Sequence, residues 1–581
     1  MAETLISPGV LTRENDISFI QPAAAAVGAA FIGPAVKGPV EQPTVVTSYG
    51  QYQRLFGTTF QSGSNSFEFL TSIAVKSYFE QGGNTALVTR VVSGSFTAAS
   101  NTTITALTGA APFTLETIGK GAIYNNAKSA STIQENPDGS LATGSADNVR
   151  WEIGNINNQS GTFSLLVRRG DDSRKNKIIL ETFNDLSLDP NSENYIEKVI
   201  GNQAVSKTTE GSEVFVTTNG EYVNRSNYIR VASVARQTPN YLSTDGITVN
   251  KTAAGVSYSG SLPTAKSGSF YGATGNLYGP RASKFFKNIN SVDTQGLVAA
   301  NYADAISILG NKDEYQFNII SAPGLIYSIG THKVQLDSII SLAETRGDAI
   351  AVIDPQTFAS TVSNVTATAG TVNSSYAAAY WPWLQTQSAT GKNEWVPAST
   401  VIPGVYAFTD SAAAPWFAPA GLVKGGIPNV IQAERKVSRE QRDTLYRANV
   451  NPIATFPGQG IAVYGQKTLQ KKASALDRVN VRRLLIELKR FIGSQANNIV
   501  FEQNTIATRN KFLAIVNPYL ESVVQRQGLY AYRIVMDDSN NSADVVDRNQ
   551  IVGQVFIQPA KTAEFVVLDF TIEPTGATFV A

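Results

Sequence analysis

The chain has no cysteine and a single histidine, His332, among its 581 residues. Disulfide bonds, thiol nucleophiles and zinc sites built from cysteine and histidine are therefore excluded. A Ser-His-Asp triad is open to this sequence only through His332, which stands in a Gly-Thr-His-Lys stretch without an acidic neighbour. We interpret this histidine as a solvated loop residue rather than a catalyst.

Charged residues and long apolar runs are also scarce. Asp, Glu, Lys and Arg make up 16% of the chain, and the formal net charge is +1. No strong field therefore favours a nucleic acid or an anionic membrane as a direct partner. No run of about eighteen apolar residues predicts a membrane span, and the first residues lack the pattern of a signal peptide. We expect a soluble protein that is made in a cytoplasm, without direct nucleic-acid binding or membrane insertion.

Composition and periodicity divide the chain into five predicted parts. Residues 22–93 and 286–430 alternate strand and helix patterns and form a middle α/β domain, and residues 431–558 form a core domain. Residues 94–285 are dense in Ser, Thr, Asn and Gly, with short strand patterns typical of a β-rich inserted domain. Residues 1–21 and 559–581 are predicted to be extended terminal arms. We therefore predict a multidomain α+β and α/β fold with mixed β-sheet cores flanked by helices.

The stretch 450–469 is predicted to be the organising unit of the core domain. An extended run leads into a Gly/Pro turn at 456–460, and a short apolar strand follows at 461–464. Gly460 and Gly465 have the spacing of a phosphate-binding loop, but Gln466 occupies the position that requires lysine. We interpret this stretch as a plain turn.

An amphipathic helix is predicted to follow this unit. Asn480 is a suitable N-cap, and apolar residues then recur on one stripe from Val481 to Ile492. Arg482 and Arg483 are assigned to the opposite, charged face.

A βαβ unit is predicted from residue 317 onward. Phe317–Ile320 and Ala349–Asp354 have strand patterns, and Val334–Arg346 between them has a helix pattern, so the strands should be parallel. Asp354 ends the second strand, a place where α/β enzymes position catalytic groups. We favour the structural interpretation, in which Asp354 and Pro355 start a turn.

Two further stretches have compositions found in binding sites. Aromatic residues and prolines interleave between residues 376 and 423, which fits sugar or peptide binding but more often marks a domain junction, our preferred interpretation. Residues 537–547 have the carboxylate density of a calcium loop but lack its central glycine and closing glutamate. We therefore predict no catalytic residue, no cofactor and no metal site.

A series of short motifs runs in order along residues 1–90 and 315–581. They are Ser7–Val10, Ile319–Gly324, Arg346–Ala349, Ile353–Pro355, Pro403–Tyr406, Ala418–Gly421, Phe456–Ile461, Val479–Leu484, Phe501–Asn504 and Pro559–Val566. In this order they resemble the contractile tail sheath proteins of myoviruses and of related phage-derived injection particles. Residues 94–285 match no motif of that family.

The resemblance implies a structural subunit rather than an enzyme. Six-fold rings of such a protein stack helically around an inner tail tube, and contraction drives the tube through a target cell envelope without nucleotide hydrolysis. The implied partners are further copies of the chain, the tube protein, and baseplate and tail terminator proteins. The implied location is the virion tail sheath, assembled in the host cytoplasm.

Two contact sites are predicted on this basis. The arms carry apolar strand residues for pairing with neighbouring subunits, namely Val10, Leu11, Val566, Leu568, Phe570 and Ile572. A short helix over 542–548 presents Asp544, Asp547 and Arg548, which by the resemblance face the tube. We also expect residues 96–285 to project outward and to contribute little to ring contacts.

One alternative belongs to another class of protein. A carboxylate-dependent hydrolase of envelope glycans needs only a pair of acids, so the lack of cysteine and the single histidine do not exclude it. The β-rich domain would then be its binding face.

Overall fold

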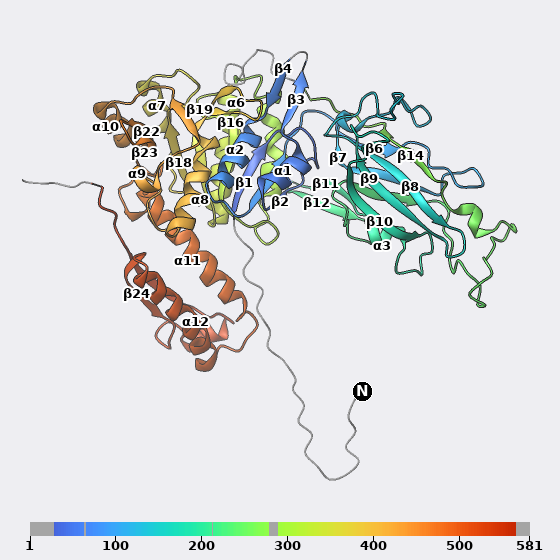
Figure 1. The fold of residues 1–581 in the computed structure, drawn as a ribbon. Helices are drawn as coiled ribbons and strands as arrows, with labels where there is room; N and C mark the ends of the chain where they lie inside the picture. The colour runs from blue at the N-terminus through green and yellow to red at the C-terminus, as the bar shows by residue number, and fades with distance from the viewer. Residues whose placement is uncertain (1–27, 63–64, 212, 278–288, 565–581) are drawn as a thin grey trace, which may run out of the picture.

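The structure of the protein, a computed structural model, describes residues 28–62, 65–211, 213–277 and 289–564. A central body carries a β-rich unit on one side and a smaller helical lobe, formed by the C-terminal part of the chain, on the other (Figure 1). This arrangement confirms the predicted mixed α/β multidomain fold.

The central body is built on one eight-stranded sheet. Its strands, in spatial order, are β2 (Thr44–Val46), β5 (Ala86–Arg90), β1 (Gly28–Gly33), β16 (Phe317–Ile326), β17 (Ile350–Asp354), β18 (Ala377–Trp381), β22 (Val450–Phe456) and β23 (Gly460–Val463). The six inner strands are parallel and the two outer strands are antiparallel to their neighbours. Parallel strands need covered faces, which accounts for their continuous apolar sequences.

The predicted βαβ unit is present as β16, α6 (Gly330–Arg346) and β17. The sheet also crosses the domain boundary predicted near residue 430, because β22 and β23 are its last two strands. The predicted division of the chain into five domains remains a prediction.

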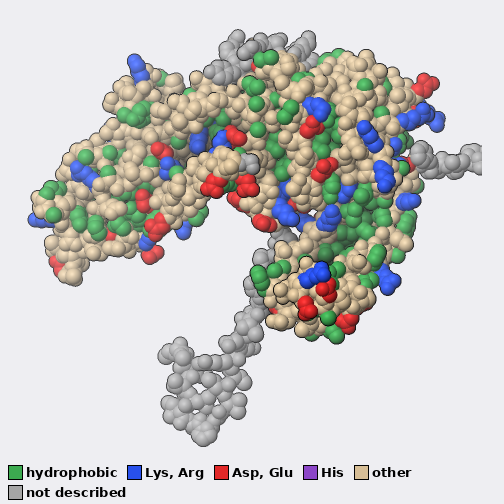
Figure 2. Space-filling view, turned by 180° about the vertical axis from the view of Figure 1, so that it is seen from behind, with side chains coloured by type: hydrophobic (Ala, Val, Ile, Leu, Met, Phe, Trp, Pro, Cys, Tyr) green, Lys and Arg blue, Asp and Glu red, His purple; other side chains and the backbone are tan. Residues whose placement is uncertain are grey.

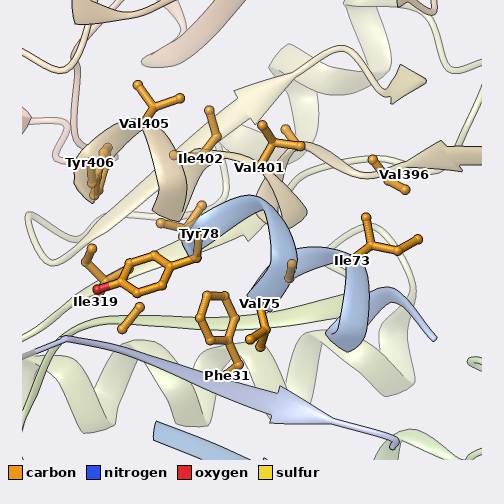
Figure 3. Packing of buried hydrophobic residues seen from close by; sticks show 14 of the residues in the cluster. Phe31, Ile73, Val75, Tyr78, Ile319, Val396, Val401, Ile402, Val405 and Tyr406 are labelled. Atoms are coloured by element: carbon orange, nitrogen blue, oxygen red, sulfur yellow. The ribbon is translucent and has the colours of Figure 1, made fainter. Parts of the chain in front are cut away.

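Helices cover both faces of this sheet. On one face lie α1 (Tyr49–Phe56), α2 (Leu70–Glu80) and α8 (Ile402–Ala412), and on the other lie α5 (Ala303–Ile308), α6, α7 (Val362–Ala369) and α10 (Arg439–Arg447). Figure 3 shows the first layer, where Phe31 of β1 and Tyr78 of α2 pack beneath Val405 and Tyr406 of α8. The two faces form separate apolar clusters.

Local sequence signals determine both ends of α1. The Ser48 hydroxyl accepts a hydrogen bond from the backbone N–H of Gln51 at the start of α1, and Gly57 ends this helix with a φ of 72°. The next helix, α2, begins at Leu70. A hairpin of β3 (Thr59–Ser62) and β4 (Asn65–Glu68) takes up the preceding residues.

The β-rich unit lies within the predicted insert. Its elements are β6 (Ala98–Asn101), β7 (Phe113–Lys120), β8 (Val149–Asn157), β9 (Thr162–Arg169), β10 (Ile179–Ser187), α3 (Ile196–Ile200), β11 (Ala204–Glu210), β12 (Glu213–Asn219), β13 (Ile229–Val234), β14 (Lys266–Gly268) and β15 (Phe270–Tyr271). They enclose an apolar cluster of their own around Trp151. The chain enters at Thr97 and returns at Thr274, where the two backbones are hydrogen-bonded at 3.2 Å.

A buried arginine joins this unit to the body. The Arg90 guanidinium, at the end of β5, donates to the carbonyl oxygens of Ala35, Gly38 and Lys120 at 3.0, 2.7 and 2.8 Å. Burial lowers the pKa of Arg90 to about 10, so the side chain still carries its charge at neutral pH. With the carbonyl of Val36 at 3.3 Å, four carbonyl acceptors compensate for the loss of hydration of this cation.

The C-terminal lobe has a separate apolar cluster. Its elements are α11 (Val479–Asn497), α12 (Ile506–Gln525), β24 (Leu529–Val535), α13 (Ala543–Asp547) and β25 (Gln554–Pro559). Trp416 of the aromatic-proline stretch packs in this cluster and donates to the carbonyl of Arg526 at 3.0 Å, as a junction residue would. Seen from behind, hydrophobic side chains gather where the lobe meets the body (Figure 2).

The prediction that Arg482 and Arg483 lie on a charged outer face of α11 is wrong. Arg483 is buried and donates to both carboxylate oxygens of Asp410 at 2.7 and 2.5 Å. Arg482 is also buried and stacks over the Tyr376 ring at 4.0 Å. Because α8 and the start of β18 cover this side, the N-terminal part of α11 is enclosed on more than its apolar stripe. The N-cap is Arg478 rather than Asn480, whose side chain donates to the Trp416 carbonyl.

The interpretation of His332 as a solvated loop residue is also wrong. The side chain lies buried in α6, and its Nδ1 accepts a hydrogen bond from the backbone N–H of Ile326 at 3.1 Å. Burial lowers its pKa to about 4, so the ring is neutral at physiological pH. The histidine therefore satisfies a backbone group at the end of β16.

Asp354 is buried at the end of β17 and has a structural contact. Its carboxylate accepts hydrogen bonds from the backbone N–H and the hydroxyl of Ser399, at 2.9 and 2.5 Å. Burial raises its pKa to about 7. The contact ties the short 3-10 helix Ala398–Thr400 to the sheet, in agreement with the structural interpretation.

Asp354→Asn is expected to change how stability depends on pH. The folded-state pKa lies above the unfolded value of about 3.9, so the folded protein retains a proton between about pH 4 and 7. Its contribution to stability therefore falls as pH rises through this window, by at most about 1.4 kcal/mol per pH unit. Asparagine keeps an acceptor for Ser399 and does not ionise. In denaturant unfolding at pH 5, 6 and 7, the free energy of unfolding of the variant should rise relative to that of the wild type as the pH increases. A constant difference would contradict the assignment.

Arg483→Met is expected to destabilise the junction of lobe and body. It leaves the Asp410 carboxylate without its partner in a largely enclosed place, which typically costs about 3 kcal/mol or more. Arg548→Met is the matched control, because the exposed pair of Arg548 with Asp544 is worth about 0–1 kcal/mol. Chemical denaturation should separate the two variants, and an equal effect would mean that the buried pair adds nothing.

Candidate functional site

The C-terminal lobe carries an incomplete β-sheet. Strands β24 and β25 pair only with each other among the described residues, antiparallel from Leu529 opposite Pro559 to Val535 opposite Gln554. Tyr532 and Ile557 on its inner face pack against the apolar cluster of the lobe. A two-stranded sheet is marginal alone, and here packing against α12 supports it.

The β24–β25 sheet also exposes two large side chains to solvent. Tyr530 is 64% exposed and Phe556 is 55% exposed, which is unusual for large apolar side chains on one small sheet. Neither outer edge has a strand partner within the described residues. Unpaired edges with exposed apolar side chains are suited to accept further strands.

A charged clamp holds the chain just after this sheet. Glu564 accepts two hydrogen bonds from the Arg478 guanidinium, at 2.7 and 3.0 Å. Its carboxylate also accepts from the Tyr446 hydroxyl at 2.8 Å and from the Gln466 amide at 3.0 Å. We call these four side chains the Glu564 clamp.

The electrostatics of the Glu564 clamp favour the ionised carboxylate. Burial acts to raise the pKa of Glu564, but the hydrogen bonds from Arg478, Tyr446 and Gln466 outweigh it and the pKa is lowered. The same carboxylate raises the pKa of Tyr446, in addition to the effect of burial. A bidentate arginine-carboxylate pair is among the stronger ion pairs in proteins. The end of the described chain is therefore fastened to the body rather than to the lobe.

The predicted arm residues lie outside the described residues. They are Val10, Leu11, Val566, Leu568, Phe570 and Ile572. Their role in strand pairing stays a prediction. The sequence reasoning missed the Glu564 clamp, because Arg478, Tyr446 and Gln466 are distant from Glu564 along the chain, and one acidic residue ahead of an apolar strand is a weak signal.

The predicted tube-contact residues lie together on an exposed surface. Asp544 belongs to α13 and forms an ion pair of 2.9 Å with Arg548, which follows the helix, and both side chains are about two-thirds exposed (68% and 66%). Asp547, the last residue of α13, is also exposed. This arrangement presents charge to solvent, and the contact with a tube stays a prediction.

The other candidate binding stretches have structural roles. Asp537 accepts hydrogen bonds from Ser539 within its own turn, and no cluster of acidic residues or histidine in the described part of the chain is arranged to hold a metal ion. Gly458 and Gly460 adopt φ values of 73° and 85° in the turn between β22 and β23, as the plain-turn interpretation predicted. No described helix is long and apolar enough to span a membrane.

Comparison with known proteins identifies the central part of the chain. Residues 295–469 match the family model described as the phage tail sheath protein central domain. The match covers strands β16 to β23 of the central sheet and the helices between them.

Individual relatives agree with this match. The tail sheath proteins of Vibrio phage KVP40 and Enterobacteria phage T4 are each 40% identical to this chain, over 188 and 187 residues. Each alignment covers 32% of this chain, and the chain spans little more than a quarter (28%) of either relative. The crystal structure of the sheath tail protein Lin1278 from Listeria innocua has a similar fold, with a TM-score of 0.50 and 9% identity over 92% of this chain and 96% of that chain.

These findings also bear on the two classes of protein considered from the sequence. The relatives are named tail sheath proteins, and the glycan hydrolase alternative has no support among them. Residues 295–469 are thus similar to the phage tail sheath protein central domain, and the resemblance to contractile tail sheath proteins predicted from the short motifs is confirmed.

Proposed function

We propose that this protein is the structural subunit of a contractile tail sheath. Copies of the chain polymerise around an inner tube in stacked six-fold rings, and contraction drives the tube through the envelope of a target cell. Stored conformational energy supplies the work, without nucleotide hydrolysis. The partners are other copies of the chain, the tube protein, and baseplate and tail terminator proteins. Assembly takes place in the host cytoplasm, and the product is the virion tail sheath.

The observation that carries this proposal is the open β24–β25 sheet. Its two edges, which have no partner strand in the described part of the chain, and its exposed Tyr530 and Phe556 form a surface that water solvates poorly. Apolar strand patterns near both ends of the chain match such a surface in chemistry. Strands supplied by neighbouring copies would pair both edges and cover the aromatic side chains.

The Glu564 clamp fixes the point from which a donated C-terminal strand would start. Residues 565–581 start from a point fastened to the body, and fully extended they reach roughly 55–60 Å at about 3.3–3.6 Å per residue. That length is sufficient to cross to an adjacent subunit. A strand that crosses between subunits lets the bodies reorient during contraction while the strand pairing persists.

The energetics suit a lattice made of many moderate contacts. Burial of an apolar side chain contributes about 1.5–3 kcal/mol, and a ladder hydrogen bond contributes about 0.5–1.5 kcal/mol. The translational and rotational entropy lost on association opposes binding by about 4–15 kcal/mol. One arm therefore binds moderately, and two arms per subunit hold a polymer together.

Deletion of residues 1–20, or of residues 565–581, is expected to abolish sheath assembly. Either truncation removes one donated strand and leaves the described body and lobe intact, including the Glu564 clamp. Far-UV circular dichroism should stay close to that of the full chain, while sedimentation shows only monomers or small oligomers. Normal tubes from either truncated protein would refute strand exchange through that arm. Unfolding would assign the strand to its own subunit.

Charge reversal on α13 is expected to weaken tube binding alone. Exposed charge contacts are worth about 0–1 kcal/mol each and are screened by salt. Many such contacts together hold the tube in the extended sheath, and each is weak enough to break on contraction. Asp544→Lys with Asp547→Lys should reduce co-sedimentation with the tube while sheath polymers without tube still form. Asp313→Lys with Glu314→Lys, on an exposed turn of the body, is the matched control. Undiminished tube binding at physiological salt would contradict the placement.

A further inference from the structure

The loop between α11 and α12 displays an aromatic side chain to solvent. Phe501 is fully exposed (102%) and Val500 beside it is 57% exposed. The φ of Phe501 is 70°, in the left-handed region that residues with a Cβ atom rarely adopt. A bulky apolar residue held in this conformation, outside any apolar cluster, is suited to contact a partner.

The loop is held in place by its own contacts. The backbone N–H of Glu502 donates to the carbonyl of Ile499 at 3.1 Å, and the Asn504 side chain donates to the carbonyl of Gln550 at 2.8 Å. Ile499 packs against the apolar cluster of the lobe. The exposed position of Phe501 therefore follows from a defined loop geometry.

The body carries a groove with complementary properties. The groove has a volume of about 850 Å³ and lies between α8, the end of α2, β21 (Val430–Ala433) and the start of β23. Its lining includes Phe408, Val423, Ile427, Ile431 and Ile461. Val423 is 83% exposed and Ile431 is 52% exposed. A groove of this size accommodates several side chains.

The loop and the groove of one copy are separated by a rigid helix. Arg483 of α11 is bound to Asp410 of α8, and α8 also supplies Phe408 to the groove. From Arg483 to the end of the helix at Asn497, a rise of about 1.5 Å per residue carries the chain about 20 Å further. The loop is therefore displaced from the groove of its own subunit.

We propose that the 500–502 loop of one subunit inserts into this groove of a neighbouring subunit. A projection and a recess at different places on one chain form a head-to-tail contact, the type that builds rings or helical polymers. Glu502 is exposed beside Phe501, and the groove lining includes the exposed Lys436. The lining also contains Glu80, but this carboxylate pairs with Lys76 at 3.8 Å, so Lys436 is the cation available to Glu502. The inference rests on the proposed sheath function, and it adds an interface distinct from the terminal arms.

The absence of native cysteine allows a direct test by cross-linking. Full-length protein with both Phe501→Cys and Ile431→Cys is assembled and then oxidised. A disulfide needs Cα atoms within about 7 Å, so the inserted loop should produce a ladder of covalent multimers. Each single-cysteine variant should give at most dimers, and a mixture of the two should give heterodimers. Assembled particles without multimers, or a disulfide within one chain, would overturn the proposal.

Exchange of the charges gives an independent measurement. Glu502→Lys and Lys436→Glu should each raise the critical concentration for assembly, and the double variant should restore it. Phe501→Ala should raise it by at least about tenfold, whereas Ile247→Ala, at an exposed position of the β-rich unit, should not. Circular dichroism of each variant confirms folding.

Failure of the double exchange to restore assembly would overturn the contact. The proposal would also be overturned if Phe501→Ala lost only tube binding, because the loop would then contact the tube rather than a neighbouring subunit. If these variants assemble normally while arm truncations do not, the sheath function stands without this interface.

Discussion

A buried ion pair holds the C-terminal lobe of this protein to its body. Arg483 of α11 reaches both carboxylate oxygens of Asp410 on α8, and its guanidinium stacks over Tyr406 at 4.7 Å. The pair lies where the lobe and the eight-stranded sheet meet. An unpaired charge at such a place is costly, so arrangements of lobe and body that separate Arg483 from Asp410 are disfavoured. Together with Trp416, which packs in the apolar cluster of the lobe, it fixes the lobe against the body.

The surfaces on the lobe share one physical property. Among residues 28–62, 65–211, 213–277 and 289–564, no strand pairs with the outer edges of the β24–β25 sheet, and the sheet exposes aromatic rings such as Phe556. The Glu564 clamp meanwhile returns the chain to the body beyond this sheet. A folded chain with open edges and a fastened departure point for its last segment suits a subunit of a polymer, in which other copies complete what one copy lacks.

Much of the fold is readable from local sequence patterns. The β16–α6–β17 unit, the helix beginning after Ser48 and the glycine turn before β23 are predictable because their signals lie within a few adjacent turns of chain. The short motifs, taken in their order along the chain, likewise indicate the sheath family. The open β24–β25 sheet is not predictable in this way, since a strand pattern does not reveal how many partners a strand has.

The sequence by itself determined the apolar strands, the helix periodicity, the lack of cysteine chemistry and the resemblance to tail sheath proteins. Only the tertiary structure decided the environment of individual polar residues. His332 and Arg483 are residue types that usually lie at the surface, yet both are buried. Other parts of the chain cover them and supply their hydrogen-bond partners. Glu564 acquired its three partners in the same way. Periodicity reports which side of a helix is apolar, whereas burial depends on what packs against the other sides.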